Sequence, residues 1–577
     1  MKNLKLLLML SLVLILSFAL AACTDDSNVD PESDSADGGE ESSGDTEGGE
    51  GGEGGEGGEG GDLVISEMSD VVSLDPHGNN DVPSSNVRSN IYDTLTVLDE
   101  NMEVQPGLAT EWEQVDDNTW EFTLKEGVMF HDGTEFNAEA VEANLKRITD
   151  PAMASPRMFL YEMITDVEPV DDYTVEITTE YPFAPLLAHL AHDAGGMLSK
   201  DVIDADYEQA LSDSGEEMTL EEYYELRDNG GEEHEEVANA ISENMGQHAA
   251  ENAIGTGPFK VQSRAAGEEV VLERNDDYHE EPVALDTVTF KVVPETAARI
   301  AELETGDSHV AGAVESNNME RVDSHEETYL DNTESLSLSY IGFNMEKEPL
   351  DDPLVRQAIS HAIDREAIID GVYDGVGIPA QGPLAPDVFG YDESVEGLSY
   401  DMDRAKELMA EAGYEDGFSL EIWTNDSPQR IDTAVYLQES LKELNIELNV
   451  EQLEWGAYLE RTAQGEHDMF VLGWSTVTGD ADYGMYPLFH SEMHGDPGNR
   501  SFMSNDEVDA LLEEGRQETD PEARQEIYSE AQEMLVDIAP MAYIHHQNYL
   551  TGVRTEVQNF EVDALGIYQL DEVTIGE

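Results

Sequence analysis

The sequence predicts an α/β protein built from more than one domain. Its 577 residues exceed what one hydrophobic core ordinarily organises, so two or three domains are expected. From Asp62 onward, strand-like and helix-like patterns alternate along the chain, which is the layout of α/β domains. Apolar residues make up 39% of the chain, enough for globular packing, and the mean hydropathy of −0.45 excludes a polytopic membrane protein.

The predicted strands alternate apolar and polar residues with a period of two, the pattern of half-buried strands. The first begins at Leu63, and later ones are centred on Phe122, Val175 and Phe290. A continuous apolar run over 469–472 is typical of a fully buried strand.

Three helices are predicted in the second half of the chain. Asp352 followed by Pro353 suits an N-cap and first helical position, and apolar residues then recur with helical spacing to Ile363. A second helix covers 403–412 and ends at Gly413. A third covers 432–444 and leads into a strand pattern at 446–450.

The charge of the chain is strongly negative, with 27 Lys and Arg against 129 Asp and Glu. The low-complexity segment 24–62 holds only 15 of these acids, so residues 63–577 still carry 114 acidic against 25 basic residues. Self-repulsion on this scale is tolerable where salt screens charge over ~3 Å, as near 1 M. We therefore expect an acidic protein adapted to high salt, and no nucleic-acid binding, which needs basic patches.

The N-terminus has the pattern of a secretory signal over residues 1–22. Lys2 and Lys5 precede an apolar stretch that ends in Ala21-Ala22. The Leu20–Cys23 segment resembles a bacterial lipobox, which implies cleavage before Cys23 and lipidation of that cysteine; a single membrane anchor is the alternative. Cys23 is the only cysteine, which excludes an internal disulfide framework and a zinc site built on cysteines.

Two segments have unusual composition. Residues 23–61 are rich in Gly and Glu, and we expect a disordered tether there because such a segment buries no apolar surface. Residues 203–253 are dense in Glu and poor in large apolar residues, which predicts a peripheral acidic insertion that is partly helical.

Five segments resemble, in order, the family 5 bacterial extracellular solute-binding proteins, which serve oligopeptide, dipeptide, nickel and glutathione importers. They are 106–151, GTGPF at 255–259, 340–369, AKELMAEAGY at 405–414 and LGWSTVTGDADY at 472–483. FHDGTEFNAEAVEANL and GWSTVTGDAD look closest to the glutathione-binding branch.

The resemblance implies a two-lobed clamp of the periplasmic-binding-protein type (type II, similar to cluster C) with an extra third domain. Domain I is expected to comprise 62–94, 254–334 and 535–577. Domain II is expected at 95–253 and domain III at 335–534. A short peptide or glutathione would lie between domains I and III, and closure of the lobes would enclose it.

Asp482 matches the family position whose carboxylate takes the ligand ammonium, and Asp480 is a second candidate. Both would also serve as turn caps after Gly479. Trp474 matches a family tryptophan near the ligand, where an aromatic wall tolerates varied side chains. A core position is the alternative for Trp474.

The other candidates are less directly implied. Trp423 is either a second aromatic wall or a hinge residue, and Tyr340 is expected near the crossing between domains I and III. Asn344 lies in the same segment, where it lines the cleft or fixes the backbone. For the ligand carboxylate, Arg430 and Arg88 are the candidates, because an arginine holds a carboxylate through two hydrogen bonds.

Other chemistries have less support in the sequence. His490 and His494 have a spacing that can share a metal on a helix, but Gly495 and Pro497 indicate a loop, and we expect neither metal nor cofactor. No GxSxG, Walker-type or dinucleotide-binding motif is present, so the prediction is a binding protein and not an enzyme. A nickel-chelate binder or a peptide-sensing receptor would share the fold. The expected partners are the permease subunits of an ABC importer, and we expect a monomer.

Overall fold

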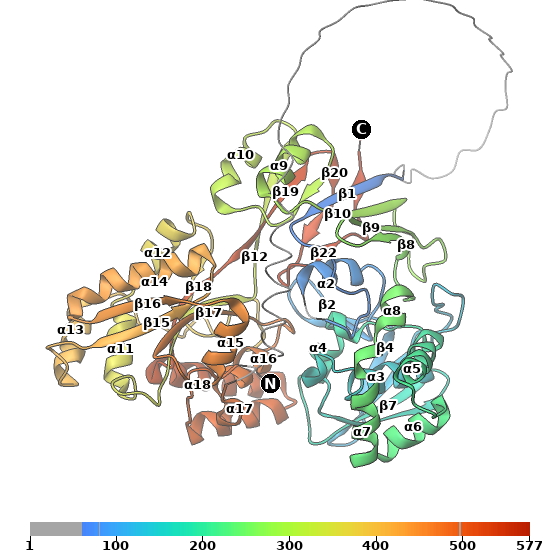
Figure 1. Cartoon of the computed structure of the whole chain (residues 1–577), viewed down its shortest axis with the longest axis horizontal. Helices are drawn as coiled ribbons and strands as arrows, with labels where there is room; N and C mark the ends of the chain where they lie inside the picture. Colours follow the sequence, from blue (N-terminus) through green and yellow to red (C-terminus); the bar gives the residue numbers. More distant parts are fainter. Residues whose placement is uncertain (1–59, 80, 496–497, 577) are drawn as a thin grey trace, which may run out of the picture. The chain divides into compact units, whose positions relative to one another are not determined.

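A computed structural model describes residues 60–79, 81–495 and 498–576. The predicted signal segment, most of the predicted tether and Cys23 lie outside these residues. Within the described part, no helix has the length and apolar character needed to cross a membrane. Three larger sheets organise this part of the chain (Figure 1).

The first sheet has seven strands in the order β12-β19-β11-β1-β10-β9-β8. Its central strand β1 (Asp62–Glu67) pairs in parallel with β10 (Thr287–Val292) and β11 (Val310–Ala311). The remaining members are β8 (Phe259–Ala265), β9 (Glu269–Arg274), β12 (Thr328–Glu334) and β19 (Asn548–Arg554). Helices α9 (Thr296–Thr305) and α10 (Met319–Asp323) belong to the same region. The strands predicted at Leu63 and Phe290 are therefore neighbours in domain I.

The second sheet has six strands in the order β14-β18-β13-β17-β15-β16. The strands are β13 (Ser337–Phe343), β14 (Ile378–Pro379), β15 (Ser419–Thr424), β16 (Glu447–Gln452), β17 (Met469–Ser475) and β18 (Met541–His546). One hydrophobic cluster contains residues of α11 (Pro353–His361), α12 (Arg365–Val372), α13 (Met402–Glu411) and α14 (Pro428–Ser440). The other contains residues of α15 (Trp455–Ala463), α16 (Ala481–Phe489), α17 (Asp506–Gln517) and α18 (Pro521–Ile538).

Two chain segments join these sheets. β12 continues into β13 through Ser335, and β18 continues into β19 through Gln547. The Ser335 hydroxyl donates to the Gln547 carbonyl over 2.6 Å, which ties the two crossings together. The predicted boundary of domain III at 534 is therefore too early, because β18 is a strand of the six-stranded sheet. Its residues are all buried there, and domain I resumes only after Gln547.

Domain II is built on a four-stranded sheet in the order β4-β5-β7-β6. The strands are β4 (Ala109–Gln114), β5 (Thr119–Leu124), β6 (Ile164–Asp171) and β7 (Thr174–Thr179), with helix α3 (Ala138–Ile148) and the short helix α4 (Leu186–Leu190). A small hairpin, β2 (Thr96–Leu98) and β3 (Val104–Pro106), lies at the start of the domain. Phe122 and Val175, predicted on alternating strands, are fully buried in its core.

The acidic insertion is helical, and one of its faces is buried. It forms α5 (Lys200–Ser214), α6 (Leu220–Asn229), α7 (Glu232–Ile241) and α8 (Gln247–Glu251). Tyr207, Tyr223 and Ile241 are fully buried in the same hydrophobic cluster as Leu63 and Ile65 of β1. A few aromatic and aliphatic residues at helical spacing suffice to bury this face, whatever the charge of the other.

Candidate functional site

A pocket of about 360 Å³ is the principal candidate site. Its walls come from both of the first two domains, from the segment after β17 and from the C-terminal part of the chain. The lining segments are α2 (Val82–Arg88), 89–94, 97–98, 106–107, 157, 191–193, 278–280, 477 and parts of 563–571. A volume of this size suits a small ligand of two or three amino acids.

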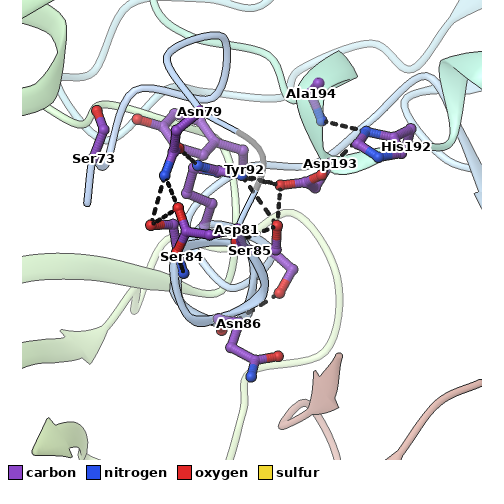
Figure 2. Close-up of polar contacts among 12 residues, drawn as sticks. Ser73, Asn79, Asp81, Ser84, Ser85, Asn86, Tyr92, His192, Asp193 and Ala194 are labelled. Carbon is purple, nitrogen blue, oxygen red and sulfur yellow. Dashed lines mark hydrogen bonds and ion pairs between the residues drawn. The ribbon is translucent and has the colours of Figure 1, made fainter. Parts of the chain in front are cut away.

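Helix α2 places Arg88 in the pocket wall. The helix begins because the Asp81 carboxylate accepts the backbone N–H of Ser84 and a proline occupies the first turn. Arg88 lies in the last turn, where a positive charge is favoured by the helix dipole. Its guanidinium donates to the Asp193 carboxylate, over 3.2 Å from Nε, and to the Ser85 hydroxyl over 3.1 Å. Figure 2 shows Asp193 facing Ser85 across this cluster.

The charges of this wall are set by burial and by the arginine. Burial opposes ionisation of Asp193, but the charge of Arg88 outweighs it and holds the Asp193 pKa well below its usual range. Burial lowers the pKa of neighbouring His192 to about 3, so this ring is neutral at physiological pH. Its Nδ1 accepts the backbone N–H of Ala194, as Figure 2 shows. Because the pKa of Asp193 is so low, its carboxylate is charged at physiological pH and forms an ion pair with Arg88.

Carboxylates gather on another wall of the pocket. Asp93 accepts hydrogen bonds from the Thr256 hydroxyl over 2.7 Å and from Tyr278 over 3.3 Å, and His279 Nε2 lies 2.9 Å away. Loss of solvent, together with the charges of Asp93 and Glu280, raises the pKa of Asp571 to about 6. A cation bound beside these carboxylates would relieve their mutual repulsion.

Arg157 connects the pocket to an aromatic stack. Its Nη1 donates to the Tyr483 hydroxyl over 3.1 Å. The Tyr483 ring stacks on Phe159 of domain II, with centroids 5.8 Å apart, and on Trp474 at 5.3 Å. Trp474 Nε1 donates to the Tyr483 carbonyl over 2.9 Å. Trp474 therefore does not line the pocket. It lies behind Tyr483, which contacts the lining residue Arg157, and it packs against the hydrophobic clusters of domains II and III.

Comparison with known proteins identifies the chain. The sequence model described as the middle part of bacterial extracellular solute-binding proteins, family 5, matches residues 103–496. The chain belongs to this family. The relatives of this family 5 protein are binding proteins rather than enzymes.

Two curated relatives show how far the likeness extends. The dipeptide-binding protein of Escherichia coli K12 is 30% identical over 82% of this chain and 86% of its own length. The glutathione-binding protein GsiB of Salmonella typhi is 31% identical over 83% of this chain and 88% of its own length.

A solved structure gives the same fold. The periplasmic binding protein DppA of Helicobacter pylori, associated with an ABC transporter and solved in complex with the peptide STSA, has a TM-score of 0.72 and 30% identity. The alignment covers 90% of this chain and 99% of that one. The predicted α/β clamp fold is therefore confirmed.

The structure gives Asp482 and Asp480 partners inside the protein. Asp482 is 3% exposed, does not line the pocket, and lies 3.0 Å from Nε of Arg516, close enough for an ion pair although not aligned as a hydrogen bond. Asp480 accepts two hydrogen bonds from Arg524, over 2.6 and 2.7 Å, and its carboxylate caps α16. Both carboxylates are neutralised by arginines, so the turn-cap alternative describes Asp480, and we assign Asp482 to holding α16 on α17.

Three further candidates lie in the core of domain III. Trp423 is 2% exposed, with the Arg461 guanidinium 4.3 Å from the ring centroid. Tyr340 is 1% exposed and packs edge-on against Phe470. Asn344 donates to the carbonyls of Gly465 and His467 and so fixes the backbone, which was one of its two predicted roles. None of these three candidates lines the described pocket.

The two arginine candidates lie in different parts of the structure. Arg88 lines the pocket, whereas Arg430 does not. Arg430 is half-buried on α14, donates to Asn425 over 3.2 Å and lies over the Trp455 ring at 5.4 Å. Its position beside the carboxyl ends of the parallel strands β15 and β16 is a common ligand position in α/β sheets, but the pocket lies elsewhere.

Sequence reasoning missed Arg157, Asp93, His279 and Asp571. Scarcity was the available signal for Arg157, because residues 63–577 hold only 25 bases. The acids carried no signal in a chain with 129 of them. Among the described residues, no group of three or more His, Cys, Asp or Glu is arranged to hold a metal; His494, for example, contacts the Met503 carbonyl over 2.8 Å.

Proposed function

We propose that this family 5 protein captures a short peptide in the described pocket and delivers it to the permease of an ABC importer. The observation that carries the proposal is the presence of both signs of charge in one pocket. Arg88 and Arg157 line it together with Asp93 and Asp571. A free peptide is a zwitterion, so its carboxylate suits the guanidinium groups and its ammonium suits the carboxylates.

The relatives support this ligand class. One is a dipeptide-binding protein, another binds glutathione, and DppA of Helicobacter pylori holds the peptide STSA. The pocket volume of about 360 Å³ agrees with a ligand of that size. Backbone groups around the ligand would add affinity without reading its side chains.

The test is calorimetric titration of the purified protein in about 1 M salt. The ligands are Met-Leu, its N-acetylated form, its C-amidated form and glutathione. We expect Met-Leu to bind and each blocked form to bind at least tenfold more weakly, since each loses one charge-assisted contact. Equal affinity for the free peptide and for both blocked forms would refute recognition of the zwitterion.

The acidic wall predicts a pH dependence of binding. Because the pKa of Asp571 is raised to about 6, its carboxylate becomes neutral as the pH falls below 6 and no longer attracts an ammonium. We expect affinity for Met-Leu to decrease between pH 7 and pH 5. In Asp571→Asn that decrease should be smaller, and an unchanged pH profile would remove Asp571 from the site.

We also propose that the protein is anchored outside the cell membrane through a lipid on Cys23. The support is the lipobox-like Leu20–Cys23 segment and the extracellular family. The folded unit would then act as a monomer on a tether and meet the permease at the membrane surface. In cells, Cys23→Ser should move the protein from the membrane fraction to a soluble fraction; retention in the membrane would contradict a lipid anchor.

A high-salt working environment is a further proposal, carried by the charge of −102. Salt should raise the melting temperature steeply up to about 1 M, because shorter screening lengths reduce self-repulsion. A melting temperature that does not change with salt would contradict it.

A further inference from the structure

A second cavity lies between domains II and III, apart from the peptide pocket. Its volume is about 550 Å³. Domain II contributes the β2–β3 hairpin, Trp120 of β5 and the α4 region, and domain III contributes 386–389, 478–480 and the start of α18. No lining residue is shared with the peptide pocket.

The walls of this cavity are mainly apolar. Val104, Leu187 and Phe389 are partly exposed on its surface, and Met102 is buried beside them. The charged pair inside it, Asp480 and Arg524, is bidentate and therefore neutral as a unit. Apolar walls around a few polar groups are the usual composition of a small-molecule site.

Two polar side chains on the cavity wall have no hydrogen-bond partner among the described residues. They are the indole N–H of Trp120 and the hydroxyl of Thr478, and Thr478 is fully buried. Buried polar groups are normally paired, because leaving one unpaired costs about 1–3 kcal/mol. An indole N–H can only donate, so its missing partner is an acceptor.

One loop separates this cavity from the peptide pocket. Val477 lines the peptide pocket, whereas the next three residues line the cavity. Gly479 has a φ of +65°, and a Cβ there would lie 3.3 Å from Met102 and 3.5 Å from Leu98. The same loop therefore borders both spaces, with Gly479 close to Met102 and Leu98.

We propose that the cavity between domains II and III binds a neutral, apolar small molecule that carries one hydrogen-bond acceptor. Both polar atoms are buried, so a side-chain rotation would bring the Trp120 N–H and the Thr478 hydroxyl to the acceptor, while the apolar part would cover Val104, Leu187 and Phe389. The exposed Glu103 and Asp387 at the rim disfavour an anion. The site is additional to the peptide pocket and does not depend on the proposed peptide ligand.

The probe for this site is Prodan, a neutral naphthyl ketone whose fluorescence shifts to the blue on leaving water. We expect saturable binding of one Prodan per chain. Thr478→Val removes one hydrogen-bonding group while keeping the shape, and Trp120→Phe removes the indole N–H while keeping an aromatic ring; each should weaken binding roughly three- to tenfold. Val104→Trp fills the cavity from a partly exposed position and should abolish binding.

The matched control is Leu565→Trp, which fills the peptide pocket instead. It should leave Prodan binding unchanged, and circular dichroism should show that every variant is folded. Loss of binding in Leu565→Trp, or unchanged binding in Val104→Trp, would place the probe elsewhere and overturn the proposal. Absence of saturable binding to the unaltered protein would overturn it as well.

Discussion

Arg147 and Arg88 are buried to nearly the same degree, at 0% and 1% exposure, yet their surroundings differ. Arg147 donates to Asp75 over 2.6 and 2.9 Å and to Asp206 over 2.8 Å, and both aspartates are also fully buried. Arg88 has one carboxylate, Asp193, whose side chain is 14% exposed beside the peptide pocket.

The difference distinguishes an ion cluster enclosed in the core from one that borders the peptide pocket. The Arg147 cluster joins the loop after β1, helix α3 and helix α5 of the acidic insertion. Its neighbour His77 contacts Arg147, and burial lowers the pKa of His77 to about 3, so this ring stays neutral. The Arg88 cluster has a cavity on one side.

The largest effect should come from Arg147→Met. This change leaves two buried carboxylates without their cation, and breaking such a cluster costs about 3–5 kcal/mol. Urea unfolding in about 1 M salt would measure the loss of unfolding free energy. A loss below about 1 kcal/mol would contradict a structural role for the cluster.

An effect of intermediate size is expected at Glu67, a buried carboxylate whose charge is only partly compensated by its neighbours. Burial raises the pKa of Glu67 to about 7, against a contribution from Tyr568 that lowers it, and Glu67 Oε1 has no hydrogen-bond partner among the described residues. The folded protein therefore binds more protons than the unfolded chain between pH 4.5 and 7, so this group makes stability fall as pH rises through that window.

Glu67→Gln removes that ionisation. At pH 8 the variant should be more stable than the parent by about 1–3 kcal/mol, and the difference should vanish near pH 4. Unfolding free energies at the two pH values measure it. A variant less stable than the parent at pH 8 would show that the charge is stabilised in the folded state.

Arg88→Met should cost less stability than Arg147→Met, about 1–2 kcal/mol, because Asp193 reaches water through the pocket. Thermal unfolding of the two variants side by side measures the difference. Equal losses would mean that the cavity does not relieve the remaining carboxylate.

The smallest effect is expected at the surface. Lys200 and Asp204 form an i,i+4 pair 2.7 Å apart with side chains 39% and 28% exposed. Lys200→Met should change the unfolding free energy by no more than about 0.5 kcal/mol, since such pairs are screened by water and salt. A change above about 1 kcal/mol would show that ion pairs of this acidic surface act as a network.

The sequence was sufficient for the elements that depend on local patterns. The helix at Pro353 begins with Asp352 as its N-cap, as predicted, and the apolar run at 469–472 lies in a buried strand. Residue-by-residue similarity to the family was sufficient for the fold, because motifs in a fixed order specify the topology.

The site was harder to predict because its partners are distant in sequence. Arg88 meets Asp193 from 105 residues away, and Asp482 meets Arg516, so neither pairing is visible as a motif. With acidic residues at 129 positions, the choice of the aspartate that faces an arginine is made by tertiary packing alone. Arg88 was found through its rarity, and Asp571 had no distinguishing pattern.

The most direct test of the central claim is calorimetric titration of Met-Leu into Arg88→Lys and Arg147→Lys under identical conditions. Lysine keeps the charge but loses the planar arrangement of donors. The structure predicts that Arg88→Lys weakens peptide affinity at least fivefold, whereas Arg147→Lys leaves affinity unchanged and lowers only stability. Equal affinities in both variants, with the parent protein binding tightly, would contradict the assignment of the pocket beside Arg88 as the peptide site.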